Sequence, residues 1–185
     1  MRGPRLLGRA ALLLAAAVAV ACTPQSSGQP APHGRPAAAP AAADPLATRA
    51  AALDAAIDDP GVRVSVAEGR MVVSLAEASI FLRGEPVLLQ EGGEATLAAV
   101  AKSVAGLGGA VQVIGHTDDT GTAAYALDLS ERQAQAVAEA LRAGGVPASR
   151  LRSWGLGDTD PVAPNDSPRN RSLNRRVVVS AAPTG

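Results

Sequence analysis

GHTDDTG, residues 115–121, is a polar loop that leaves a predicted strand and leads toward a predicted helix. The strand is the apolar run at residues 111–115, and the helix contains LSERQAQAV, residues 129–137. Ser130, with Gln133 three residues later, matches a capping box, which predicts that the helix begins near Ser130. The stretch therefore joins one strand to one helix and gathers polar side chains where the strand ends.

Further strands and helices are predicted on both sides of this unit. Residues 62–75 read as a β-hairpin because valines alternate with other residues before a Glu-Gly turn. Apolar residues recur at helical spacing over residues 97–104. The remaining predicted elements are a short leading helix within residues 46–61 and strands at 151–155 and 176–181. This alternation predicts an α/β fold, specifically an α+β two-layer sandwich with helices on one face of a short sheet.

Composition limits both the number of domains and the kind of ligand. The chain has 185 residues, of which 47% are hydrophobic and 2% aromatic, and its formal net charge is zero. This length predicts one compact domain. A stacking platform for single-stranded nucleic acid needs aromatic side chains, and duplex binding needs an excess of Lys and Arg. We therefore expect no nucleic-acid partner.

The first 21 residues have the pattern of a signal peptide. Arg2, Arg5 and Arg9 precede an uncharged run at residues 10–21. That run of about 12 residues is short for a bilayer-spanning helix, which needs about 20, so a permanent transmembrane anchor is the weaker reading. The run ends at Cys22, the only cysteine, which has no partner in the chain for a disulfide. Acylation of Cys22, with palmitate or a similar chain, better explains a lone cysteine at the end of the uncharged run.

Residues 18–22, VAVAC, resemble a bacterial lipobox, in which the cysteine is lipidated and becomes the mature N-terminus. Lipoboxes usually carry Leu where this chain has Ala19, so cleavage by an ordinary signal peptidase is the alternative. By the same resemblance, Thr23 after the cysteine allows sorting to an outer membrane. Acyl chains would hold the protein on the bilayer without a spanning helix.

Residues 22–45 form a predicted tether between Cys22 and the folded part. The segment has six prolines among Ala, Ser, Gly and Gln, and it cannot bury enough apolar surface to offset its ordering entropy. Organisation along the chain is therefore a signal peptide (1–21), a lipidated cysteine with its tether (22–45), a leading helix (46–61) and one domain (62–183).

The polar loop belongs to a longer series of motifs. After GHTDDTG and LSERQAQAV come GLGDTDPVAPN at residues 155–165 and NRRV at residues 174–177. In this order and at these spacings they resemble the OmpA-like C-terminal domain family, the peptidoglycan-binding module shared by OmpA, Pal and MotB. The resemblance covers about residues 62–182 and implies a βαβαβ-type fold with a short mixed sheet.

The resemblance also implies a ligand. Domains of this family hold the diaminopimelate side chain of the wall peptide, with a carboxylate on its free ammonium and an arginine on its free carboxylate. Asp118 stands where the family has the ammonium-binding aspartate, but Gln133 stands where it has the arginine of LSxxRA. Ala126 and Leu82 likewise replace an asparagine and an aspartate of the family.

Nearby arginines are candidates for the missing cation. Arg132 would substitute only if the start of the helix were rotated or its side chain wrapped around the helix, because successive helical residues point about 100° apart. A second cluster, made of Arg169, Arg171, Arg175 and Arg176, offers a cation from a neighbouring loop. The candidate ligand-binding set is Asp118, Thr117, Thr120, Gln133, Arg132 and Arg175.

Structural roles compete with these binding roles. Asp118 and Asp119 could instead cap and order the loop, as Asp side chains often do by bonding nearby backbone groups. His116 could likewise fix the loop through a hydrogen bond. Residues 174–176 are equally compatible with a salt-bridging corner that fixes the last strand against Asp118 or a neighbouring acid. Ser130 is better explained as a helix cap than as a nucleophile.

The sequence thus predicts a non-enzymatic cell-wall anchoring module, a membrane-tethered lipoprotein that binds peptidoglycan non-covalently through the diaminopimelate stem peptide. The alternative is an OmpA-fold scaffold lipoprotein that has lost wall binding. A hydrolase built from Ser130, His116 and Asp118 and a metal site at His116, Asp118 and Asp119 are both disfavoured. We expect an outer-membrane lipoprotein with a periplasmic domain, no cofactor and no metal, and further envelope proteins as possible partners.

Overall fold

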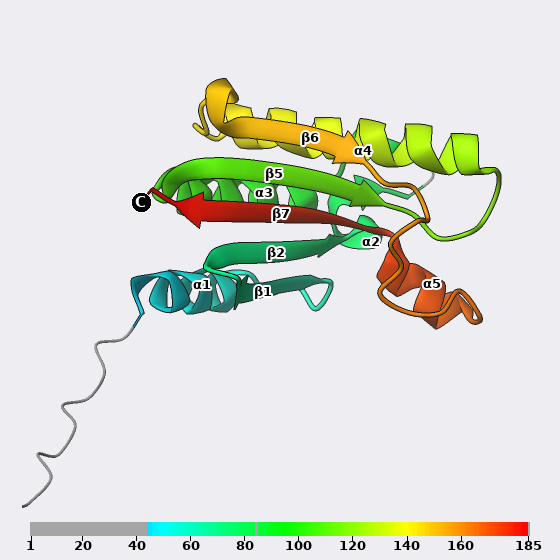
Figure 1. Ribbon diagram of the computed structural model, residues 1–185, viewed down its shortest axis with the longest axis horizontal. Helices are drawn as coiled ribbons and strands as arrows, with labels where there is room; N and C mark the ends of the chain where they lie inside the picture. Colours follow the sequence, from blue (N-terminus) through cyan, green and yellow to red (C-terminus); the bar gives the residue numbers. More distant parts are fainter. Residues whose placement is uncertain (1–43, 84, 185) are drawn as a thin grey trace, which may run out of the picture. The chain divides into compact units, whose positions relative to one another are not determined.

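A computed structural model describes residues 44–83 and 85–184 (Figure 1). The predicted signal peptide, Cys22 and nearly all of the tether lie outside these residues. The tether prediction extended to residue 45, whereas Pro45 is the first residue of a helix whose cap is Asp44, with Asp44 Oδ1 accepting the Leu46 N–H at 2.9 Å. Proline suits this first helical position because its missing N–H would be unpaired there.

Seven strands and five α-helices make up the described part of the chain. The helices are α1 (Pro45–Ala56), α2 (Glu77–Ile80), α3 (Glu91–Ala105), α4 (Ala123–Ala143) and α5 (Pro168–Asn174), with a 3₁₀ turn at Ala148–Arg150. The strands are β1 (Val62–Ala67), β2 (Arg70–Ala76), β3 (Phe81–Leu82), β4 (Glu85–Leu89), β5 (Gly108–His116), β6 (Leu151–Gly155) and β7 (Arg176–Pro183).

The main sheet has five strands in the order β1-β2-β7-β5-β6. Neighbouring strands are antiparallel except for β5 and β6, which run parallel and are connected through α4. The sheet is therefore mixed, as the family resemblance implied. β3 and β4 form a separate two-stranded sheet that the sequence analysis did not anticipate.

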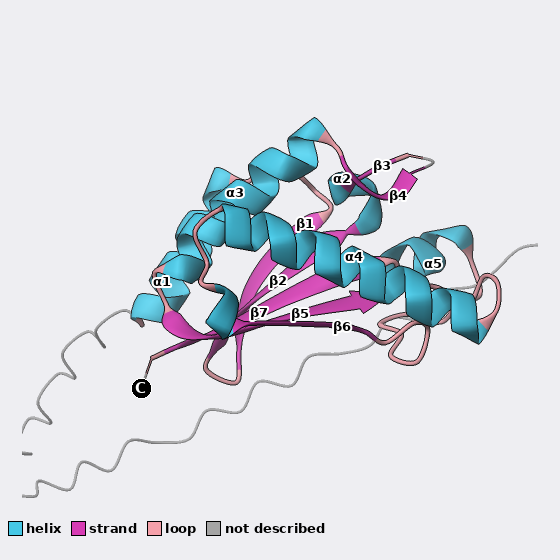
Figure 2. Cartoon of the chain, turned by 90° about the horizontal axis from the view of Figure 1, so that it is seen from above, coloured by secondary structure: helices cyan, strands magenta, loops and turns pink. Residues whose placement is uncertain are grey.

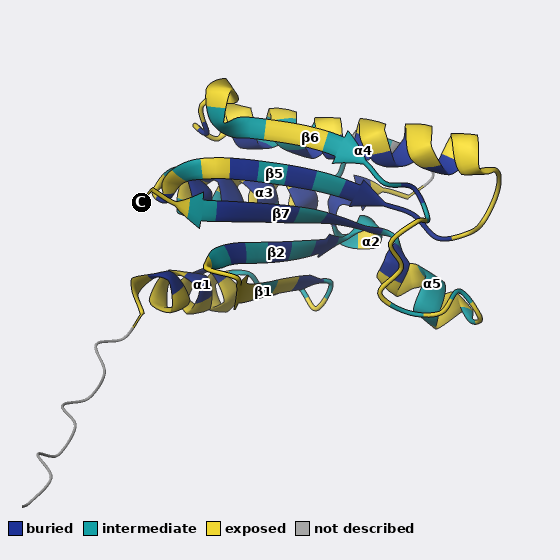
Figure 3. Ribbon diagram, in the orientation of Figure 1, coloured by how far each residue is buried: buried dark blue, intermediate teal, exposed yellow. Residues whose placement is uncertain are grey.

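The long helices cover one face of the main sheet, so the two-layer prediction is confirmed. Figure 2 shows α1, α3 and α4 on the same side of the strands. The inward side of α4 is buried and its outward side exposed (Figure 3). Among residues 44–83 and 85–184, no helix is long and apolar enough to span a membrane.

Alternation along the strands builds the core between the layers. In β2, Met71, Val73 and Leu75 are fully buried, while their neighbours face the other side of the sheet. They meet apolar side chains of the helices, among them Leu97 of α3 and Leu141 of α4. All core residues of the described chain lie between positions 46 and 181, so a chain of residues 44–185 retains the whole core.

Helix α4 begins eight residues earlier than the capping-box pattern predicts. Its N-cap is Thr122, whose hydroxyl oxygen accepts the Tyr125 N–H at 3.2 Å. Ser130 instead lies in the middle of the helix and is fully buried. Its hydroxyl donates to Leu127 O and accepts the N–H of Gly157, both at 2.9 Å, so Ser130 fixes the loop after β6 against the helix.

The seam between α4 and the strands β5 and β6 is unusually close because glycines line it. A Cβ at Gly115 would overlap the backbone oxygen of Ser130, and a Cβ at Gly155 would overlap the Ser130 hydroxyl. A larger residue at either position would therefore push α4 away from the strands. This contact fixes where β5 ends relative to α4, and the functional site lies just beyond that end.

Candidate ligand-binding pocket

A pocket of about 380 Å³ opens where β5 ends and the polar loop begins. It is bounded by α2, the loop after β5, the first half of α4, and α5 with the residue that follows it. Its lining residues are Glu77, His116, Thr117, Asp118, Thr120, Tyr125, Ala126, Leu129, Gln133, Pro168, Arg171 and Arg175. Five of the six predicted ligand-binding residues are among them, and Arg132 is not.

Asp118 lies on the pocket wall with only 7% of its surface exposed. Its Oδ1 accepts the Thr120 N–H at 3.0 Å, and its Oδ2 accepts from Arg175 Nη1 at 2.6 Å. Burial acts to raise the pKa of Asp118, but the hydrogen bonds from Arg175 and Thr120 outweigh it and leave the pKa below its ordinary value. The carboxylate is therefore ionised at neutral pH.

Arg175 bridges two carboxylates. Its Nε lies 3.0 Å from Glu77 Oε2, while its Nη1 bonds Asp118. The backbones of Glu77 and Arg175 are joined as well, because the Glu77 N–H donates to Arg175 O at 3.0 Å. The start of α2 and the residue before β7 are thus held together at the pocket. The expectation of a corner that fixes the last strand against Asp118 matches this geometry.

Gln133 projects from the inner side of α4 and is 1% exposed. Its Nε2 donates to Glu77 Oε1 at 2.8 Å. The side chain therefore faces the pocket, at the place where the family resemblance implies an arginine. Ala126 and Leu129, from the same helix, add an apolar part to the wall.

Arg132 does not reach the pocket, so its inclusion in the candidate set was wrong. It is exposed on the outer side of α4 and pairs with Asp128 at 2.7 Å, one helical turn earlier. The physical reason is the rotation between successive helical residues: since Gln133 faces inward, Arg132 faces outward.

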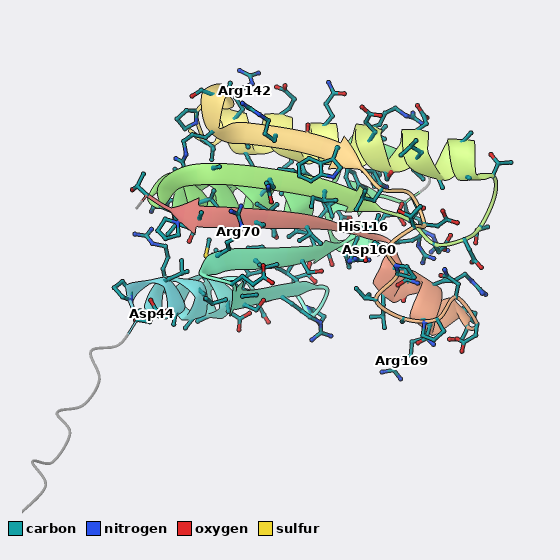
Figure 4. The ribbon with its side chains drawn as sticks, in the orientation of Figure 1. Asp44, Arg70, His116, Arg142, Asp160 and Arg169 are labelled. Atoms are coloured by element: carbon teal, nitrogen blue, oxygen red, sulfur yellow. The ribbon has the colours of Figure 1, made fainter. Side chains whose placement is uncertain are left out.

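The second arginine cluster divides between the pocket and the adjoining loop. Arg171 lines the pocket, and its Nη1 donates to Asn165 O at 2.8 Å. Arg169 points away from the fold (Figure 4). Arg176 is buried and donates to Asp160 O at 3.2 Å, which holds the loop after β6. Arg171 and Arg175 are therefore the two members of the cluster at the pocket.

Asn174 is fully buried and fixes this loop through its amide. Its Oδ1 accepts the N–H groups of Val162 and Ala163, and its Nδ2 donates to Ala163 O and Asn165 Oδ1, at 2.8–3.0 Å. All four hydrogen-bonding positions of the amide are used. The residue orders the pocket's surroundings and has no capacity left for a ligand.

His116 and Thr117 form the back of the pocket. Burial, reinforced by nearby Arg176 and only partly opposed by Asp160, lowers the pKa of His116 to about 4, so the imidazole is neutral at pH 7. Its Nδ1 and the Thr117 hydroxyl are buried and have no hydrogen-bond partner in the part of the chain that the structure describes. Asp160 Oδ2 lies 3.8 Å from His116 Nδ1, and Figure 4 shows both residues where β5 meets the loop after β6.

Ser130 does not belong to this site. It is absent from the pocket lining, and its hydroxyl proton is donated to a backbone carbonyl rather than to a base. The prediction that Ser130 caps a helix was wrong, but its role is nevertheless structural. Within residues 44–83 and 85–184, no group of three or more His, Cys, Asp or Glu side chains is arranged to hold a metal ion.

Glu77 is the main pocket residue that the sequence did not reveal. It directly follows β2 and starts a four-residue helix, and no motif or spacing singles it out. Leu82, the residue in the place of the family's aspartate, is not among the pocket residues, and the adjacent Phe81 is buried in the core. Only the three-dimensional contacts of Glu77 with Arg175 and Gln133 identify it as a pocket residue.

Comparisons with known proteins agree with this architecture. The chain is 45% identical over 74 residues to the "Probable lipoprotein YiaD" of Escherichia coli, an alignment that covers 40% of this chain and only 34% of YiaD. It is 36% identical over 113 residues to the "Putative lipoprotein YfiB" of the same bacterium, with 60% of this chain and 70% of that protein covered.

A solved structure extends the likeness to most of the fold. The cell wall anchor of the T6SS from Pseudomonas aeruginosa superposes with a TM-score of 0.65 at 31% identity, covering 75% of this chain and 97% of that one. The model of the OmpA family matches residues 80–175, just over half of the chain, including α3, α4, α5 and most of the pocket. This chain therefore belongs to the OmpA family.

Proposed function

We propose that this protein is a non-enzymatic cell-wall anchoring module that binds peptidoglycan non-covalently. The observation that supports it best is Asp118, a carboxylate kept ionised on the wall of a pocket whose size suits a peptide side chain. The likeness to a solved cell wall anchor points in the same direction. The ligand is the diaminopimelate side chain of the stem peptide, with its free ammonium on Asp118.

Asp118 has the capacity for this contact although Arg175 already bonds it. A carboxylate offers about four acceptor positions; the Thr120 N–H, the Thr120 hydroxyl and Arg175 use three of them, which leaves one for a ligand. An ammonium brings three donors, and a charge-assisted hydrogen bond contributes about 1.5–3 kcal/mol. Thr117, Thr120, Gln133 and Arg175 supply further polar groups of the pocket lining, and Ala126 and Leu129 supply apolar surface for the ligand's methylene groups.

The test is co-sedimentation of residues 44–185 with purified sacculi. Wild type should pellet with the wall, whereas Asp118→Asn should lower the bound fraction at least tenfold, since the amide keeps the shape but loses the charge. Asp119→Asn is the matched control, because Asp119 is the exposed neighbour, is not a pocket residue, and should leave binding unchanged. Circular dichroism should show that all three chains are folded.

A scaffold that has lost wall binding is the second candidate, and one observation favours it. Arg175, from the same chain, lies 2.6 Å from Asp118 and occupies part of the carboxylate that a ligand would need. If the pocket is closed in this way, wild type should stay in the supernatant with sacculi even at low salt. That result would contradict wall anchoring and support a role in protein–protein contacts within the envelope.

We further propose that the domain is periplasmic and tethered to the outer membrane through a lipidated Cys22. The similarity to proteins named as lipoproteins supports a place in the cell envelope. Expression of the full chain with labelled palmitate should label wild type but not Cys22→Ser. Labelling of both chains, or of neither, would contradict lipidation at this cysteine.

A further inference from the structure

Four side chains in the pocket form one connected series: Asp118, Arg175, Glu77 and Gln133. Arg175 contacts Asp118 at 2.6 Å and Glu77 at 3.0 Å, and Gln133 donates to the other Glu77 oxygen at 2.8 Å. One guanidinium is thus shared by two carboxylates. The series carries a formal charge of −1, and its fourth member is a neutral amide.

The Glu77 carboxylate is therefore only partly neutralised, because its guanidinium is shared with Asp118, and the pocket's second positive charge is on Arg171. Glu77 keeps 21% of its side chain exposed, so a group entering the pocket can reach it, while Gln133 adds donors but no charge. The remaining pocket guanidinium, Arg171, comes from α5, and one of its nitrogens is used by Asn165 O. Within residues 44–83 and 85–184, the cation paired with Glu77 is Arg175, which Asp118 shares.

We infer that, given the proposed function, this pocket selects a diaminopimelate whose carboxyl group beside the bound amine is a neutral carboxamide rather than a carboxylate. A carboxylate there would face Glu77 with like charge in a partly desolvated site. A carboxamide has two N–H donors for the Glu77 oxygens, and Gln133 beside Glu77 brings no cation that would favour a carboxylate. Glu77 and Gln133 are then the residues that set specificity, and Asp118 provides the common ammonium contact.

The experiment compares two soluble stem peptides that differ only in this group, the free diaminopimelate acid and its amide. Isothermal titration calorimetry with residues 44–185 should give tighter binding of the amidated peptide, by about tenfold, the order expected for one like-charge contact in a half-exposed pocket. Equal affinity, or tighter binding of the free acid, would overturn the inference. Tighter binding of the free acid would assign Arg171 as the carboxylate's partner instead.

Two variants should change the preference without removing the ammonium contact. Glu77→Gln should bring the ratio of the two dissociation constants close to one, because the like charge is gone. Gln133→Arg should reverse the ratio in favour of the free acid, because a cation then stands beside Glu77. If Gln133→Arg fails to fold, Glu77→Gln alone decides, and an unchanged ratio in that variant would contradict the assignment.

Matched controls are available on the outer side of α4. Gln135→Arg makes the same substitution two residues along the helix at an exposed position, and Glu131→Gln removes an exposed carboxylate. Both should keep the wild-type ratio. Sacculus binding separates the two proposals: wall binding without a preference for the amide defeats only this inference. Absence of binding to sacculi and to both peptides defeats the proposed function as well.

Discussion

The same two elements, β5 and α4, form a tight seam near the last residues of β5 and an open pocket directly beyond it. At the seam, Gly115 lies so close to Ser130 that the backbones leave no room for a methyl group. One residue later β5 ends at His116, and the loop that follows carries the chain away from the helix. The spacing of the two layers is therefore fixed by backbone contact at the seam and not by the charged side chains of the pocket.

The seam should be the least tolerant part of the fold. Gly115→Ala should lower the free energy of unfolding by about 3 kcal/mol or more, since the added methyl overlaps the Ser130 backbone oxygen, which cannot move without shifting α4. Urea denaturation measures this. Gly92→Ala is the control: nothing lies within 4 Å of its Cβ, and it should leave α3 unchanged or stabilise it by up to about 1 kcal/mol.

A loss of less than about 1 kcal/mol in Gly115→Ala would show that α4 can slide over the sheet. The contrast between seam and pocket would then disappear, because neither region would set the distance between the layers.

His116 marks the transition between the two regions and should give the fold a pH dependence. Its pKa is about 4 in the folded chain, against about 6.5 when unfolded, so between these values the unfolded chain binds a proton that the folded chain does not. Stability should therefore fall by about 2–3 kcal/mol as the pH drops from about 6.5 to 4, and stay level above 7. Denaturation midpoints measured across this range test the expectation.

The variant His116→Asn identifies the source of this dependence. Whatever its stability at pH 7, its unfolding free energy should lose most of the slope between pH 6.5 and 4. Asp118 also lowers the free energy of unfolding as the pH falls, but at a lower pH than His116. Its folded pKa is depressed, so its stabilising charge is lost only as the pH falls below the ordinary carboxyl range. An unchanged slope in His116→Asn would contradict the assignment to His116.

The ion pairs of Arg175 in the pocket should affect the ionisation of Asp118 more than the free energy of unfolding. Arg175→Gln should raise the pKa of Asp118, because it removes the guanidinium that favours the ionised form, while costing less than about 1 kcal/mol of stability for a partly exposed pair. Carboxyl-carbon NMR titration measures the pKa. Arg132→Gln removes an exposed arginine that pairs only within α4, and it should leave Asp118 unchanged.

An Asp118 pKa that does not move in Arg175→Gln would show that Thr120 alone sets the charge. The charge of Asp118 would then depend only on its own loop and not on a contact with a distant segment. The pocket and the seam would differ only in how closely their atoms pack.

Local patterns were sufficient for most of the fold. The valine alternation predicted the β1–β2 hairpin, and the strand at 151–155 has the predicted bounds. The start of α4 was missed because Ser130 has the residue type of a cap while its hydroxyl is used by Leu127 O and the N–H of Gly157, which lies 27 residues away. A tertiary contact of that kind leaves no local signal.

The pocket likewise contains residues that a local motif predicts and residues that only tertiary contacts place there. Asp118 could be predicted because it follows a strand in a recognisable loop, whereas Glu77 could not. Its link to Gln133 spans 56 residues, and its link to Arg175 joins segments at opposite ends of the folded part. Arg132 was included because it is the arginine next to Gln133, but the rotation between successive helical residues turns it outward, where it pairs with Asp128.

The most direct measurement is a crystal structure of residues 44–185 with a diaminopimelate stem peptide bound. The account predicts the ligand's ammonium nitrogen within about 3 Å of an Asp118 carboxylate oxygen, the spacing of a charge-assisted hydrogen bond. A structure in which Arg175 still covers Asp118 and the peptide lies on another surface would contradict it.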